Sequence, residues 1–82
     1  MKDLVELLAK NIVDDSKSVK VGLEPADEGE IVTLSVNPND MGKIIGKGGK
    51  VIKAIRTLVK IKAIKENKRV YLRLDEEGAQ SP

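Results

Sequence analysis

The sequence has 82 residues, of which 40% are hydrophobic and 34% are charged, and it carries a net charge of +2. This length gives one domain with a small core, and no uninterrupted apolar run exceeds three residues, so a transmembrane helix is excluded and no signal peptide is expected. The chain has no cysteine and no histidine, which excludes disulfides and removes the commonest transition-metal ligands, and we expect a cytoplasmic protein without a metal or other cofactor.

The first half of the chain predicts one helix and two strands. Residues 2–13 place their apolar side chains on one stripe of a helix, which the polar residues 14–16 end. Residues 19–24 and 32–36 alternate apolar and other side chains, as strands do, and residues 25–29 between them have the composition of a turn. We expect these two strands to pair as an antiparallel hairpin.

Two helices should follow. Asn37-Pro38 is a good helix start, because Asn can cap free N–H groups and Pro suits the first helical position. The first of these helices is short and ends at Gly46, and a long one begins near Gly49. The apolar positions of the long helix form one wide stripe, namely Val51, Ile52, Ile55, Leu58 and Val59. Ile61 and Ile64 extend this surface, which predicts a heavily packed C-terminal half.

The chain ends with a turn, a strand and a polar segment. Residues 66–68 predict the turn and residues 70–74 the third strand. We assign residues 1–74 to one domain and residues 75–82 to a flexible acidic tail. The order helix-strand-strand-helix-helix-strand predicts an α+β fold, in which a three-stranded sheet has helices packed on one face.

Charge is divided unevenly along the chain. Residues 1–42 hold four Lys against nine Asp or Glu, a balance of −5. Residues 43–73 hold eleven Lys or Arg against Glu66 alone, a balance of +10, and residues 74–82 contribute −3. A run of basic residues with a single acidic one favours a surface that binds a polyanion. The alternative is that these lysines only keep a small domain soluble.

The basic run begins at a glycine loop, Gly46-Lys47-Gly48-Gly49, called the GKGG loop below. Three glycines let the backbone approach a ligand closely, and the N–H groups that open the next helix favour an anion. The spacing does not match nucleotide-binding loops. Counted from Gly42, Lys47 stands where GxxxxGK[ST] needs a glycine, and Val51 breaks the pattern GxGxxG.

Catalysis is not expected. The serines and threonines have no activating histidine, and the acidic pairs Asp14-Asp15 and Asp27-Glu28 fall in turns, where capping or solvation explains them. We therefore predict no catalytic residue and no small-molecule substrate. Modules that stack bases on several aromatic rings are also excluded, because Tyr71 is the single aromatic residue.

Residues 45–52 fit the IGxxGxxI signature of KH domains at every defined position, and this signature lies between two predicted helices. The order of elements resembles the type II KH arrangement. Over residues 1–74 the chain is similar to the small bacterial RNA-binding KH proteins of the KhpA (YlqC-like) family. That resemblance implies a cytoplasmic protein that binds single-stranded RNA, as an RNA chaperone or post-transcriptional regulator. It also implies a possible partner, either a larger KH-containing protein of the KhpB type or a second copy of this chain.

The resemblance places the RNA-binding residues at the loop and its flanks, namely Lys43, Ile44, Ile45, Gly46, Lys47, Gly48, Gly49, Lys50, Val51, Lys53 and Arg56. The loop should clamp the backbone of about four nucleotides, while the lysines and Arg56 steer phosphates. Packing in the core competes with RNA contact for the apolar side chains, and we expect Ile45 and Ile52, the first and last residues of the signature, to favour the core.

Three questions stay open at this point. KH domains use a groove that has the loop-bearing helices on one side and a strand in the opposite wall. Val32 and Lys20 are only loose candidates for that opposite wall. Tyr71 is expected on the outer face of its strand, either simply exposed or part of an association surface. A protein-interaction or assembly module and a general binder of single-stranded nucleic acid, DNA included, remain alternatives to RNA binding.

Overall fold

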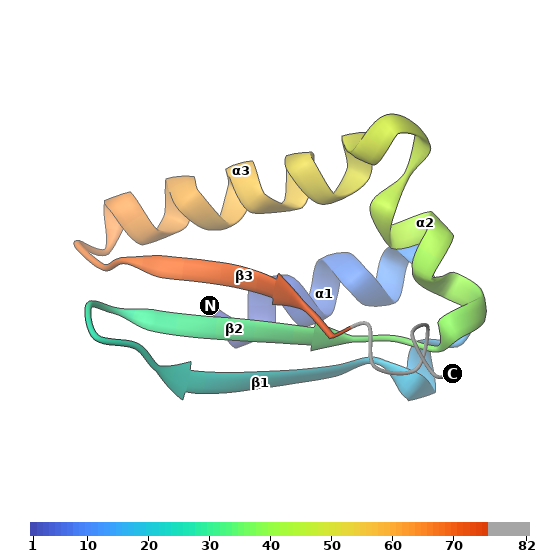
Figure 1. The fold of residues 1–82 in the computed structure, drawn as a ribbon, viewed down its shortest axis with the longest axis horizontal. Coiled ribbons are helices and arrows are strands. Elements are labelled where there is room, and N and C mark those ends of the chain that lie inside the picture. Colours follow the sequence, from blue (N-terminus) through green and yellow to red (C-terminus); the bar gives the residue numbers. More distant parts are fainter. Residues whose placement is uncertain (76–82) are drawn as a thin grey trace.

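The computed structural model describes residues 1–75. Its helices and strands, in chain order, are α1 (Lys2–Ile12), β1 (Lys20–Pro25), β2 (Glu30–Ser35), α2 (Met41–Ile45), α3 (Lys50–Lys65) and β3 (Val70–Leu74). This order confirms the predicted α+β arrangement (Figure 1). Apart from Asp75, the flexible acidic tail predicted for residues 75–82 lies outside the described residues.

The three strands form one mixed sheet in the order β1-β2-β3. β1 and β2 pair antiparallel, as the predicted hairpin requires, and β2 and β3 pair parallel. A parallel pair needs a crossover connection, and here α2, the GKGG loop and α3 supply it. The loop therefore lies in the middle of the segment that joins the central strand to the edge strand.

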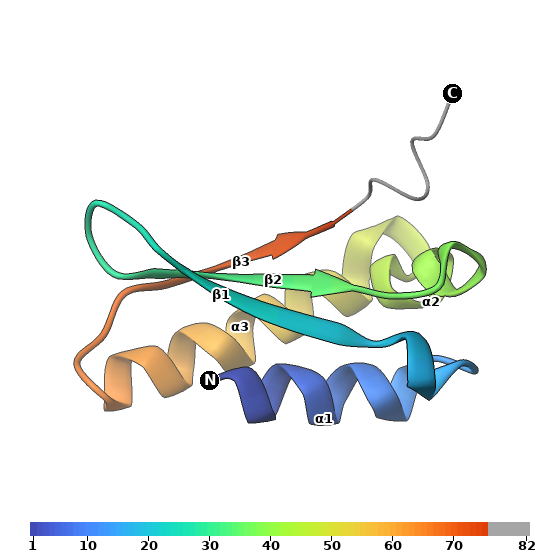
Figure 2. The same cartoon turned by 90° about the horizontal axis from the view of Figure 1, so that it is seen from below.

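The core lies between the sheet and the helices. α1 and α3 cover one face of the sheet, and α2 lies at the end where β2 and β3 finish (Figures 1 and 2). Alternate side chains of β2, Val32 and Leu34, are fully buried on this face, as the period of a strand dictates. The turn end of β1 lies beyond the N-terminal end of α1 (Figure 2), and Leu23 there remains exposed.

The predicted packing of the C-terminal half of α3 is wrong. Ile61 and Ile64 are 58% and 66% exposed, and Leu58 is exposed as well. The buried side of α3 is a narrower stripe, made of Ile52, Ile55, Val59 and Ala63. Leu58, Ile61 and Ile64 lie off that stripe, so α3 keeps exposed apolar surface on the sides that do not face the sheet. Within residues 1–75, no helix has the length and hydropathy that a bilayer span requires.

Candidate nucleic-acid interface

The GKGG loop is one tight turn between two helices. α2 ends at Gly46, whose φ is +76°, and residues Lys47–Gly49 make a single 3-10 turn before α3 begins at Lys50. A side chain at position 46 would not fit, because a Cβ there would lie 2.4 Å from Cγ2 of Val51. Glycine at this position lets the start of α3 pack directly against the end of α2.

The outer side of the loop is open. Lys47 and Gly48 are exposed, and a Cβ built at Gly48 or Gly49 would meet no atom within 4 Å. No side chain caps the N-terminus of α3, which follows directly, so N–H groups of its first turn remain available to a ligand. This backbone, together with the positive end of a 16-residue helix, favours an anionic ligand.

Four of the predicted cations lie at the loop and along α3, and none of them has a carboxylate partner among residues 1–75. Lys47, Lys50, Lys53 and Arg56 are all exposed. None of them takes part in the ion pairs that the structure forms within residues 1–75. No side chain among residues 1–75 therefore compensates their charges. The four side chains are available to contact phosphates, which is the role the sequence predicted for them.

Lys43 differs from these four cations. Its ammonium donates a hydrogen bond to the carboxylate of Asp14 and lies 4.0 Å from that of Asp40. The hydrogen bond to Asp14, helped by both negative charges, raises the pKa of Lys43 above its ordinary value of 10.5. Lys43 thus differs from the other predicted phosphate contacts, because the carboxylates of Asp14 and Asp40 already compensate its charge.

The apolar residues of the signature, and Ile44 ahead of it, divide between core and surface. Ile44 is fully buried in the core, so its side chain offers no surface to a ligand. Ile52 is buried, as expected, whereas Ile45 and Val51 are half-buried and pack against the edge of the core. Ile45 and Val51 are therefore the signature's apolar side chains with surface beside the loop.

A buried carboxylate that the sequence did not single out anchors the loop-bearing helix. Asp40 is 3% exposed and accepts hydrogen bonds from the backbone N–H groups of Asp14 and Asp15, at 3.2 and 3.0 Å. Asp15 in turn accepts from Ser18 and from Asn37. The predicted start at Asn37 is confirmed, because its side chain accepts the N–H of Asn39 at 2.9 Å.

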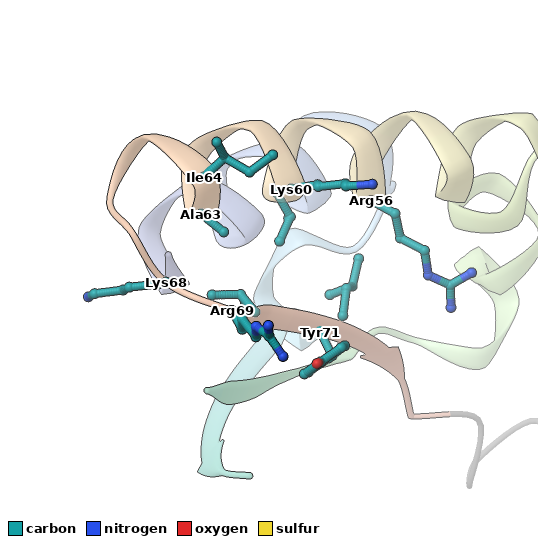
Figure 3. Close-up of a pocket in the computed structure, with 10 residues that line it drawn as sticks. Arg56, Lys60, Ala63, Ile64, Lys68, Arg69 and Tyr71 are labelled. Carbon is teal, nitrogen blue, oxygen red and sulfur yellow. The ribbon is translucent and has the colours of Figure 1, made fainter. Parts of the chain in front are cut away.

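A groove of about 450 Å³ opens between α3 and the edge strand β3 (Figure 3). Arg56 is the member of the predicted set that lines it, and Tyr71 lies on its β3 side. The two earlier candidates for the opposite wall are wrong. Val32 is fully buried in the central strand, and Lys20 belongs to β1 at the far edge of the sheet. Strand order, which local sequence does not encode, puts β3 beside α3.

The exposed side chains at and beside the loop are cations. Within residues 1–75, no cluster of three or more His, Cys, Asp or Glu side chains is arranged to hold a metal ion. The exposed cations and the open glycine backbone lie at the loop and along α3, and Arg56 belongs both to this set and to the lining of the groove.

Comparison with known proteins identifies the family of the chain and several relatives. A family described as "KhpA/KhpB, KH domain" matches residues 2–74. The chain is 51% identical to RNA-binding protein KhpA of Clostridium perfringens, over 90% of this chain and 99% of that relative. It is 47% identical to RNA-binding protein KhpA of Clostridium acetobutylicum, again over 90% and 99%, and 38% identical to that of Aquifex aeolicus, over 90% and 94%. No solved structure matches the chain significantly.

Proposed function

Because this chain belongs to the KhpA/KhpB KH-domain family and has the type II order of elements, we propose that it binds single-stranded RNA at the GKGG loop. Its similar relatives are named as RNA-binding proteins, in agreement with the expectation that it is not an enzyme. The observation that carries the proposal is the exposed loop backbone, where nothing lies within 4 Å of the Cβ positions of Gly48 and Gly49.

In this proposal the phosphates of the strand lie against the N–H groups of the loop and of the first turn of α3. Lys47 and Lys50 supply charge at the loop, and Lys53 and Arg56 continue it along the helix. The half-buried side chains of Ile45 and Val51 give the bases an aliphatic surface beside the loop. Lys43 contributes less, because Asp14 holds its ammonium.

Such contacts grip the backbone and read little sequence. Aliphatic surfaces do not distinguish bases by hydrogen bonding, so low selectivity follows. This suits an RNA chaperone or a post-transcriptional regulator that acts on cytoplasmic RNA. Binding of RNA and DNA oligonucleotides of one sequence, compared in the same buffer, tests whether a 2′-hydroxyl contributes.

The double variant Lys47→Asp, Gly48→Asp tests the proposal. It should abolish RNA binding in a fluorescence anisotropy titration, while its circular dichroism spectrum and melting stay nearly unchanged, because both side chains project into open space and Asp tolerates a positive φ. The matched control is Lys17→Asp, Gly22→Asp, which makes the same charge change at exposed positions away from the loop. Full RNA affinity in the folded loop variant would refute the proposal.

Salt dependence gives a second measure of the same contacts. About three to five phosphate contacts predict that the logarithm of the binding constant falls with the logarithm of salt concentration, with a slope of roughly −2 to −3.5 for a single strand. A slope near zero would show that phosphates do not provide the affinity.

A second candidate function, association with a second copy of this chain, is favoured by one observation. Leu4, Leu7, Leu58 and Ile61 place apolar surface on the outer side of α1 and α3, and Leu7 is 60% exposed. The larger KhpB-type partner is the alternative occupant of this surface. Arg69 and Arg73, before and on β3, form ion pairs with Glu28 and Glu24.

Light scattering coupled to size-exclusion chromatography tests the second candidate. A dimer that Ile61→Lys dissociates, and that RNA does not affect, would support it. Ile64→Lys is the matched control, since Ile64 is exposed to a similar extent on α3 but lines the groove beside β3 instead. A monomer at all concentrations would contradict association between copies.

A further inference from the structure

We propose that the free edge of β1 is a contact between two copies of this chain, in which the two β1 strands pair antiparallel and the two sheets join into one. β1 lies at the border of the fold, and among residues 1–75 no helix or strand covers the side away from β2 (Figure 1). This edge is distinct from the outer side of α1 and α3. The contact is also separate from RNA binding at the GKGG loop, and neither depends on the other.

Two residues of β1 point their backbone polar groups outward. Leu34 of β2 directs its C=O to β3, where it accepts the N–H of Asp75 at 2.8 Å. Residues directly opposite in an antiparallel pair point toward each other or away from each other, so Val21, opposite Leu34, points away from β2. Leu23, two positions on, points the same way. The free edge ends at Pro25, because proline has no N–H to donate.

The charges of β1 select one register for such a pair. Lys20 and Glu24 stand two residues to either side of Gly22. An antiparallel pair centred on Gly22 therefore sets Lys20 of each copy opposite Glu24 of the other, and the two-fold symmetry repeats this pair. A pair centred on Lys20 or on Glu24 would oppose like charges, which is unfavourable. A pair centred on Val21 or Leu23 would set a charged side chain opposite glycine.

This register also satisfies the free edge. It places Val21 of one copy opposite Leu23 of the other, and outward-pointing residues that face each other exchange both N–H···O=C hydrogen bonds. Between these pairs, the two Gly22 residues form a pair without hydrogen bonds, in which the Cα atoms are about 4.5 Å apart. An added Cβ at Gly22 would meet nothing within 4 Å in the single chain, so the close approach of the second strand is unobstructed.

The side chains on both faces of β1 suit the same contact. Leu23 is 48% exposed at the end of β1 that extends beyond α1 (Figure 2), and Val21 is half-buried against the core. Across the contact each exposed Leu23 gains Val21 of the other copy as an apolar neighbour. On the open face, one carboxylate oxygen of Glu24 lies 3.0 Å from Arg73, which leaves the second oxygen for Lys20 of the other copy. Lys20 forms no ion pair within residues 1–75.

Crosslinking tests the centre of the contact. The chain has no cysteine, so the thiol of Gly22→Cys can form a disulfide only with a second copy of the variant. A Cα separation of about 4.5 Å lies within the range that a disulfide spans. Mild oxidation should convert Gly22→Cys to a covalent dimer much faster than the control Lys17→Cys, which is exposed but lies outside β1. Equal rates for the two variants would show collisions alone and overturn the proposal.

Exchange of charge tests the register. Lys20→Glu opposes two carboxylates at each pair, and Glu24→Lys opposes two ammonium groups. Because each dimer contains the pair twice, either variant alone should raise the dissociation constant of the dimer about fivefold or more. An equimolar mixture of the two variants should restore association, since one copy then carries only carboxylates at these positions and the other only ammonium groups. Sedimentation equilibrium of each variant and of the mixture measures this.

The background of the experiment isolates the β1 edge. All chains in the sedimentation measurements carry Ile61→Lys, so that the outer side of α1 and α3 does not contribute. Circular dichroism establishes that each variant is folded. A folded Ile61→Lys chain that stays monomeric over its soluble concentration range would overturn the proposal. A mixture that associates no more than its two components would overturn the register. RNA binding is measured separately at the loop, so neither result bears on it.

Discussion

The carboxylate of Asp40 accepts a hydrogen bond of 3.0 Å from the backbone N–H of Asp15, which lies 25 residues earlier in the chain. A second oxygen of the same carboxylate accepts the N–H of Asp14 at 3.2 Å. The entrance to α2 is thereby joined to the segment that leaves α1, and the helix that carries the GKGG loop is held against the first helix of the fold.

Replacing Asp40 with alanine should therefore destabilise the protein. The change leaves the backbone N–H groups of Asp14 and Asp15 without their acceptor. Asp40 is only 3% exposed, so water has little access to replace the carboxylate. Hydrogen bonds to charged groups predict a loss of about 2–4 kcal/mol in the free energy of unfolding, measured by urea denaturation. Asp27→Ala, in an exposed turn, is the control and should change stability by less than about 0.5 kcal/mol. Equal stability of the two variants would contradict the anchoring role.

Releasing Lys43 should strengthen RNA binding. Asp14→Asn removes the carboxylate that holds the ammonium, so the cation becomes available to a phosphate. One added phosphate contact should steepen the salt slope by about 0.7. Asp3→Asn removes the same charge from α1 and is the control, with an unchanged slope expected. If both variants gain affinity equally, only net charge matters and the ion pair does not restrain Lys43.

Alanine at Gly46 and at Gly42 should have opposite effects. At position 46 the new Cβ would meet Val51 at 2.4 Å, on a backbone with a φ of +76°. The expected cost is about 2–4 kcal/mol in unfolding free energy, with a loss of RNA affinity because the loop moves. At Gly42, inside α2, nothing lies within 4 Å, and alanine should stabilise the helix by about 0.5–1 kcal/mol. Similar melting temperatures for the two variants would contradict this difference.

Acid should weaken the segment that holds α2. Hydrogen bonds from Ser18 and Asn37 lower the pKa of Asp15 below its ordinary value of 3.8. A carboxyl whose pKa is lower in the folded state contributes stability above its ordinary pKa and loses it as the pH falls through the folded value. The melting temperature of the wild type should thus fall below about pH 4, and Asp15→Asn should show a smaller fall over the same range. Parallel pH profiles would show that Asp15 does not contribute.

Local signals in the sequence were sufficient for the elements and for the loop. The helix start at Asn37, the hairpin turn and the bend at Gly46 each depend on residues within a few positions of one another, and the structure confirms them. The periodicity of α3 located its buried face but not the width of that face, which is why Ile61 and Ile64 were misplaced.

Contacts between distant residues could not be predicted in this way. The partner of Lys43 is 29 residues away, and the acceptor for Asp15 is 25 residues away. The parallel pairing of β2 with β3, which sets β3 beside α3 and brings Tyr71 to a groove, depends on the topology of the whole sheet. A lone surface aromatic residue carried no such information in the sequence.

The position of the GKGG loop inside the crossover between β2 and β3 has a thermodynamic consequence. Both ends of the crossover are fixed by strands that pair with each other, and Gly46 is fixed against Val51. The loop cannot rearrange widely without moving Ile44 and Ile52, which the helices on either side of it bury in the core. A ligand that meets it finds a preorganised surface and loses little of its binding free energy to ordering the protein, so the entropy of association is dominated by the flexible nucleic acid.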